Sequence, residues 1–86
     1  MKARSNHFEV HLELKSRNGL QQFMETIRKF GLKIDDMESN PAYANSGLGV
    51  YSVKFTVIGE ELKSKKHSDI IEALSALDFV YFIEEI

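Results

Sequence analysis

The sequence predicts an α+β fold, in which a four-stranded antiparallel sheet carries two helices on one face. Three observations support this prediction. Apolar and polar residues alternate strictly near the start of the chain, two later segments place apolar residues at helical spacing, and further alternating segments follow them. The elements therefore occur in the order β-α-β-β-α-β. With 86 residues, the chain can form one small domain with a modest core.

The first predicted strand covers residues 7–14, and residues 1–6 before it are expected to be a tail or linker. Successive side chains of a strand point to opposite faces of the sheet. The apolar face of this strand should be buried, whereas its polar face should contact water or a second subunit. That polar face carries His7, Glu9, His11 and Glu13. His7 and His11 would lie roughly 13 Å apart, too far to bind one metal ion together.

The first predicted helix covers about residues 19–30. Its apolar stripe consists of Leu20, Phe23, Met24, Ile27 and Phe30. Asn18 is expected to cap its N-terminus, and Gly31 is expected to end it in the left-handed conformation. The second strand should begin directly afterwards, at Leu32, and a polar connection rich in Asn, Ser and Gly should follow up to Gly49.

The third strand is predicted at residues 50–58, with one face formed by Tyr51, Val53, Phe55 and Val57. The charged segment at residues 60–67 breaks the periodicity. A second helix should follow, capped by Ser68 and ended near Asp78. Its core positions should be Ile70 or Ile71, Leu74 and Leu77. The last strand is predicted at residues 80–83.

Right-handed crossovers through the two helices place the first and third strands in the centre of the sheet and the second and fourth at its edges. This arrangement is ferredoxin-like. It occurs in proteins of many functions, so the function has to be argued from the sites.

Composition and motifs argue against several function classes. The chain has no cysteine, which excludes disulfides, zinc–thiolate sites and the cysteine-based metallochaperones of this topology. The formal net charge of −2 argues against a nucleic-acid partner. The segment 47–51 has the glycines of an RNA-recognition strand, but Leu48 and Val50 stand where its stacking aromatics belong. No acid–base or nucleophile–base pair stands at a readable spacing, so a non-catalytic function without a cofactor is expected.

The junction between the first strand and the first helix is the best candidate site. Gly19 is expected to turn the backbone at positive φ and to let a ligand or a second subunit approach closely. The free N–H groups of the helix start offer a place for a carboxylate or another anion. Arg17 would flank that anion by its charge, and Asn18 by its amide or as the cap. The predicted ligand-binding residues are Arg17, Asn18, Gly19 and Leu20.

The same junction and the segment after the helix resemble the first β-α-β part of ACT domains. That family has, loosely, a strand, Asp-x-x-Gly followed by an aliphatic residue, a helix, and Gly-Ile-x-Ile. Gly19-Leu20 matches the first motif and Gly31-Leu32-Lys33-Ile34 matches the second, while Ser16 stands where the family often has aspartate. The resemblance implies that residues 7–86 form an ACT-like regulatory domain, which pairs with other copies.

The whole chain most resembles the C-terminal soluble domain of MgtC/SapB membrane proteins. The similar features are the long polar connection before Val50, the charged break at residues 60–67 and an end directly after the last strand. The resemblance implies a regulatory or oligomerisation domain on the cytoplasmic side of the cell membrane, attached to a membrane-embedded domain and linked to magnesium homeostasis. The basic start, Lys2 and Arg4, would suit a position next to the membrane. The alternative is a freestanding ACT-type sensor that binds a small ligand such as an amino acid.

Two further surfaces bear on partners. Acidic residues of the second strand (Asp35, Asp36 and Glu38) and of the last strand (Glu84 and Glu85) could together collect a hard cation such as Mg²⁺. A solvated acidic rim is the favoured interpretation, so no metal site is expected.

The last strand carries apolar residues on both faces, namely Tyr81, Phe82 and Ile83. One set should pack under the helices. The outward set, together with Ile58, could form the apolar part of a homodimer interface that also covers an unpaired strand edge. A homodimer is therefore expected.

Overall fold

The computed structural model describes residues 6–43 and 45–86, and it contains the predicted elements in the predicted order. The strands are β1 (His7–Leu14), β2 (Leu32–Ser39), β3 (Gly49–Val57) and β4 (Val80–Glu85). The main helices are α1 (Leu20–Phe30) and α3 (His67–Ser75). Shorter helical turns are η1 (Arg17–Gly19), η2 (Pro41–Tyr43) and α2 (Glu60–Lys63). Most of the predicted tail, including Lys2 and Arg4, lies outside the described residues.

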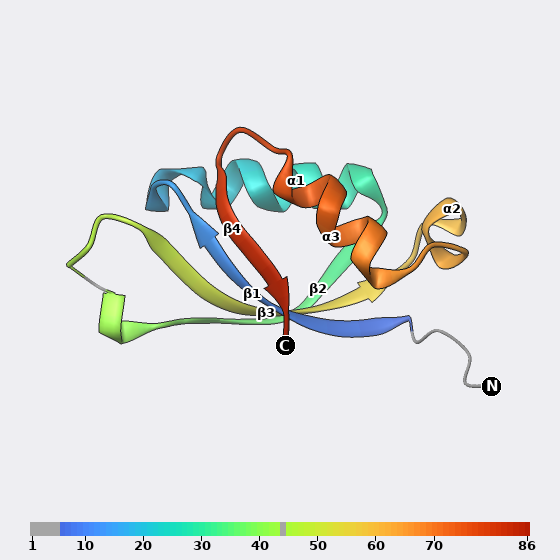
Figure 1. Cartoon of the computed structure of the whole chain (residues 1–86), viewed down its shortest axis with the longest axis horizontal. Helices are drawn as coiled ribbons and strands as arrows, with labels where there is room; N and C mark the ends of the chain where they lie inside the picture. The colour runs from blue at the N-terminus through green and yellow to red at the C-terminus, as the bar shows by residue number, and fades with distance from the viewer. Residues whose placement is uncertain (1–5, 44) are drawn as a thin grey trace.

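The four strands form one antiparallel sheet in the order β2-β3-β1-β4. This order confirms the predicted fold class and the central position of the first and third strands. Helices α1 and α3 lie on the same face of the sheet, and the β2–β3 connection projects from one end of it (Figure 1). In the described part of the chain, no helix is long and apolar enough to cross a membrane.

The core lies between the sheet and the two main helices, and the central strand β1 forms its middle. Val10, Leu12 and Leu14 have no exposed surface, as the strict alternation predicted. The fully buried residues that α1 and α3 add are Phe23, Ile27, Ile70 and Leu74. Burial of such a side chain stabilises the fold by about 1.5–3 kcal/mol. These side chains therefore fix both helices on the sheet.

The second main helix differs from the prediction at both ends. α3 begins at His67, so Ser68 lies inside the helix and does not cap it, and the helix ends before Asp78. Tertiary contacts fix its start instead. The His67 ring stacks on Phe8 with 4.5 Å between ring centroids, and its Nδ1 lies 2.9 Å from Oε2 of Glu85.

Gly31 ends α1 in the left-handed conformation, with φ 111°, as predicted. The N–H groups of Ile58 and Gly59 both donate to its carbonyl oxygen at 2.9 Å. A Cβ atom on Gly31 would lie 3.1 Å from Cα of Gly59 and 3.2 Å from Cδ1 of Leu62. Leu62 is the buried residue of α2, a turn that the sequence showed only as a charged break. Gly31 thus joins the end of α1 to the end of β3 at a distance too short for a side chain.

Replacement of Gly31 by alanine should destabilise the fold more than replacement of Gly47, the other glycine with positive φ. Nothing lies within 4 Å of a Cβ at Gly47, so Gly47→Ala should cost only the left-handed backbone strain, about 1 kcal/mol. Gly31→Ala adds the contacts with Gly59 and Leu62, and we expect a total loss of about 2–3 kcal/mol. Urea denaturation measures both free energies of unfolding. Equal losses for the two variants would contradict the close approach.

Candidate functional site

The loop between β1 and α1 differs from the prediction in its backbone. Gly19 has φ −80°, not a positive φ, because the chain enters α1 through the turn η1. Ser16 caps that turn, and its Oγ accepts a hydrogen bond from the N–H of Asn18 at 3.0 Å. Gly19 itself takes the N-cap position of α1, so the prediction that Asn18 caps this helix is wrong.

Of the four predicted ligand-binding residues, Arg17 alone lines the cavity at this loop. Leu20 packs against the core and Asn18 is exposed. A Cβ atom on Gly19 would lie 3.6 Å from Cβ of Phe79, which is an ordinary contact. The structure therefore gives no sign that Gly19 is needed for the close approach of a ligand or a second subunit that the sequence predicted there.

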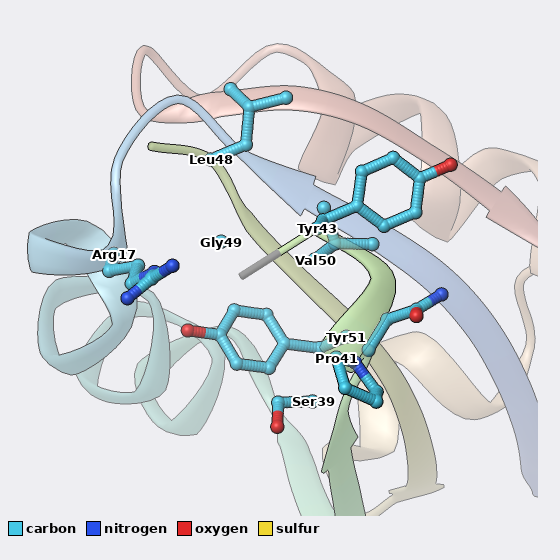
Figure 2. Close-up of a pocket in the computed structure, with 9 residues that line it drawn as sticks. Arg17, Ser39, Pro41, Tyr43, Leu48, Gly49, Val50 and Tyr51 are labelled. Carbon is cyan, nitrogen blue, oxygen red and sulfur yellow. The ribbon is translucent and has the colours of Figure 1, made fainter. Parts of the chain in front are cut away.

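The cavity lies between the β1–α1 loop and the hairpin formed by β2 and β3, and its volume is about 220 Å³. Figure 2 shows Arg17 on one side of it, the Tyr51 ring below and Tyr43 on the far side. The other lining residues are Ser39, Asn40, Pro41, Leu48, Gly49 and Val50. The site thus combines segments that are far apart in the sequence.

Gly49 makes room for the Tyr51 ring in the wall of the cavity. Its φ is not positive, yet a Cβ atom there would lie 2.8 Å from Cε2 and 3.1 Å from Oη of Tyr51. The Tyr51 ring therefore lies over Gly49 with its hydroxyl directed toward Arg17 (Figure 2). Tyr51 is only 9% exposed, so the surrounding side chains hold the ring there. Sequence reasoning assigned Tyr51 to the core and missed this site; the signal was a glycine two residues before an aromatic residue at a strand start.

The β2–β3 connection forms the far wall through its own hydrogen bonds. Oδ1 of Asn40 accepts from the N–H of Ala42 at 3.0 Å, and the N–H of Asn40 donates to the carbonyl oxygen of Val50 at 2.9 Å. The N–H and Oγ of Ser46 both donate to the carbonyl oxygen of Tyr43, at 3.1 and 2.8 Å. These bonds fix the backbone of the connection that carries Tyr43.

Among the described residues, Arg17 is the only charged one that lines the cavity. In the part of the chain that the structure describes, its guanidinium has no ion-pair or hydrogen-bond partner. A guanidinium offers several N–H donors in a planar fork that matches a carboxylate or a phosphate. The cavity can therefore attract an anion, and the hydroxyl of Tyr51 points to the same place.

The acidic residues considered as a cation site do not come together. Those of β2 (Asp35, Asp36 and Glu38) and those of β4 (Glu84 and Glu85) lie on opposite edges of the sheet, with β3 and β1 between them. The suggested combination is therefore wrong. Asp35 instead accepts a hydrogen bond from Oγ1 of Thr56. Within residues 6–43 and 45–86, no group of three or more His, Asp or Glu residues is placed to hold a metal ion.

The exposed apolar side chains also fall on separate edges. Tyr81 and Phe82 belong to β4, whereas Ile58 lies with Met24 and Ile34 in a groove between α1 and β2. The prediction that Ile58 shares a surface with the outward residues of the last strand is wrong, because β2 and β4 are the two edges of the sheet.

Comparisons with protein-family models, with curated proteins and with solved structures gave no match. The resemblances to ACT domains and to MgtC/SapB proteins therefore stay predictions that rest on the residues named above. A function can be argued from the geometry of the cavity and of the sheet edges, which does not depend on these resemblances.

Replacement of Gly49 by alanine should displace the Tyr51 ring and cost about 1–3 kcal/mol of stability, because the new methyl group overlaps the ring. In a Tyr51→Leu background the ring is absent, so the same substitution should cost less. A double-mutant cycle by thermal or urea denaturation measures the difference, which we expect to be about 1 kcal/mol or more. Strictly additive losses would show that the two residues do not contact each other.

Proposed function

We propose that this chain is a non-catalytic regulatory domain that binds a small anionic ligand beside Arg17 and passes the binding event to a second copy of itself. The observation that carries the proposal is a cavity in which Arg17 is the only charged residue among those that the structure describes. Within residues 6–43 and 45–86, the lining holds no histidine, lysine or carboxylate that could act as a base on the hydroxyl of Ser39 or of a tyrosine. That composition supports binding rather than turnover.

The edge of β4 is the proposed pairing surface. An edge strand offers unpaired backbone groups to another strand. Tyr81, Phe82 and the following Ile86 are 64%, 44% and 69% exposed, so this edge also offers apolar surface. The other edge, β2, offers less apolar surface, because its Ile34 and Met37 are partly buried against the core.

Direct contacts connect the loop beside the cavity with the start of β4. The N–H of Lys15 donates to the carbonyl oxygen of Phe79 at 3.0 Å, and Gly19 lies against the Phe79 side chain. Phe79 directly precedes β4, whose register with β1 shifts between Glu13 and Leu14. A ligand that shifts this loop would therefore shift the start of β4. Ligand binding can change the pairing of two copies only to the extent that the ligand binds one arrangement of the pair more tightly than the other.

The resemblance to MgtC/SapB proteins supports a finer proposal, in which the chain is the cytoplasmic C-terminal domain of such a membrane protein. Magnesium homeostasis would then be the task of the whole protein. The reading frame upstream of Met1 tests this: hydrophobic spans that end shortly before Lys2 support it. A native start codon at Met1, with no such spans, would overturn it. The cavity favours a freestanding sensor of a small ligand as the second candidate.

Pairing through β4 predicts a selective effect of charge at Phe82. Phe82→Glu places a carboxylate on the pairing edge, and we expect it to convert a dimer at tens of micromolar chain into a monomer. Met24→Glu is the matched control, because Met24 is 41% exposed and Phe82 44%, but Met24 lies on α1. Size-exclusion chromatography with light scattering gives the masses. A monomeric parent protein, or a monomer caused only by Met24→Glu, would contradict pairing through β4.

A further inference from the structure

From the charges and hydrogen bonds of the cavity, we infer that its ligand is a small monocarboxylate with an apolar body and no ammonium group. This inference, which rests on the proposed ligand-binding function, names the chemical class that the site takes. Amino acids are thereby disfavoured, because they carry a positive charge next to the carboxylate.

The carboxylate is assigned to the Arg17 side of the cavity. A guanidinium binds a carboxylate through two parallel N–H···O bonds, and such charge-assisted bonds are about twice as strong as neutral ones. The Tyr51 hydroxyl is directed toward Arg17 and is a further donor for the same oxygen atoms (Figure 2). In the described part of the chain, no carboxylate lines the cavity and competes for Arg17.

An ammonium group finds no comparable partner. Among the described residues the lining contains no carboxylate, and three of its acceptors already receive hydrogen bonds. Oδ1 of Asn40 accepts from Ala42, and the carbonyl oxygens of Val50 and Tyr43 accept from Asn40 and Ser46. An ammonium ion that leaves water without an ion partner is destabilised. The site therefore selects against amino acids by leaving their positive charge unpaired.

The side chains that form the cavity walls determine the polarity and the size of the ligand beyond its carboxylate. Leu48, Val50 and Pro41 are apolar, and Tyr51 adds an aromatic ring (Figure 2). The volume of about 220 Å³ is below the roughly 300–1,000 Å³ of pockets for drug-sized ligands, so the ligand is small. An aryl carboxylate or a short aliphatic carboxylate fits these limits, with its body against the Tyr51 ring and the apolar side chains and its charge at Arg17.

The test is an amide chemical-shift titration of the full chain, at constant ionic strength, with four probes. Benzoate is the expected class, benzamide its neutral isostere, phenylalanine its counterpart with an ammonium group, and inorganic phosphate a generic anion. We expect saturable shifts at Arg17, Gly49 and Tyr51 with benzoate, and binding at least tenfold weaker for each other probe. Arg17→Gln should weaken benzoate binding at least tenfold. Arg28→Gln, a matched change outside the cavity on α1, should not alter it.

The outcomes separate the ligand class from the function. Phenylalanine binding as tightly as benzoate, with the same dependence on Arg17, would overturn the ligand class and leave the regulatory function standing. Equal binding of benzamide or of phosphate would overturn the class as well. If no probe gives saturable shifts at the cavity, both the class and the proposed ligand-binding function are wrong.

Discussion

The pairing of β1 with β3 is the interaction on which the rest of the structure depends. Its register places Leu14, the last residue of β1, opposite Gly49, the first residue of β3. A shift by one residue would turn the buried face of β1 toward water and expose Val10, Leu12 and Leu14. The apolar core therefore fixes the register. The register in turn brings the β1–α1 loop, with Arg17, beside the hairpin that supplies Tyr51.

Two glycines then allow close contacts between the elements that this sheet positions, each for a different physical reason. Gly31 has a positive φ and lets α1 end directly against Gly59. Gly49 has an ordinary backbone, and what matters there is the missing side chain, which leaves room for the Tyr51 ring. The cavity is thus a consequence of strand register and of one absent methyl group. Arg17 supplies its charge, and the loop that carries Arg17 also touches Phe79, next to β4, the edge at which we propose that two copies pair.

Elements with a strong local pattern could be predicted from the sequence. The bounds of β1 and the end of α1 at Gly31 follow from strict alternation and from a left-handed cap, which depend on neighbouring residues alone. The start of α3 could not be predicted, because His67 is held by contacts with distant residues. Arg17 was predicted as a site residue, but its partners across the cavity were not, since they meet it only through strand pairing. The acidic edges could have been separated in advance, because the predicted strand order already put them on opposite sides.

The central claim is that ligand binding beside Arg17 changes the pairing of two copies. Sedimentation equilibrium with and without saturating benzoate measures it most directly, in the parent protein and in Arg17→Gln. We expect benzoate to change the dimer dissociation constant of the parent protein by about fivefold or more, the usual range for coupled sites, and to leave that of Arg17→Gln unchanged. A dissociation constant that benzoate does not alter in the parent protein, despite saturation of the cavity, would contradict the account.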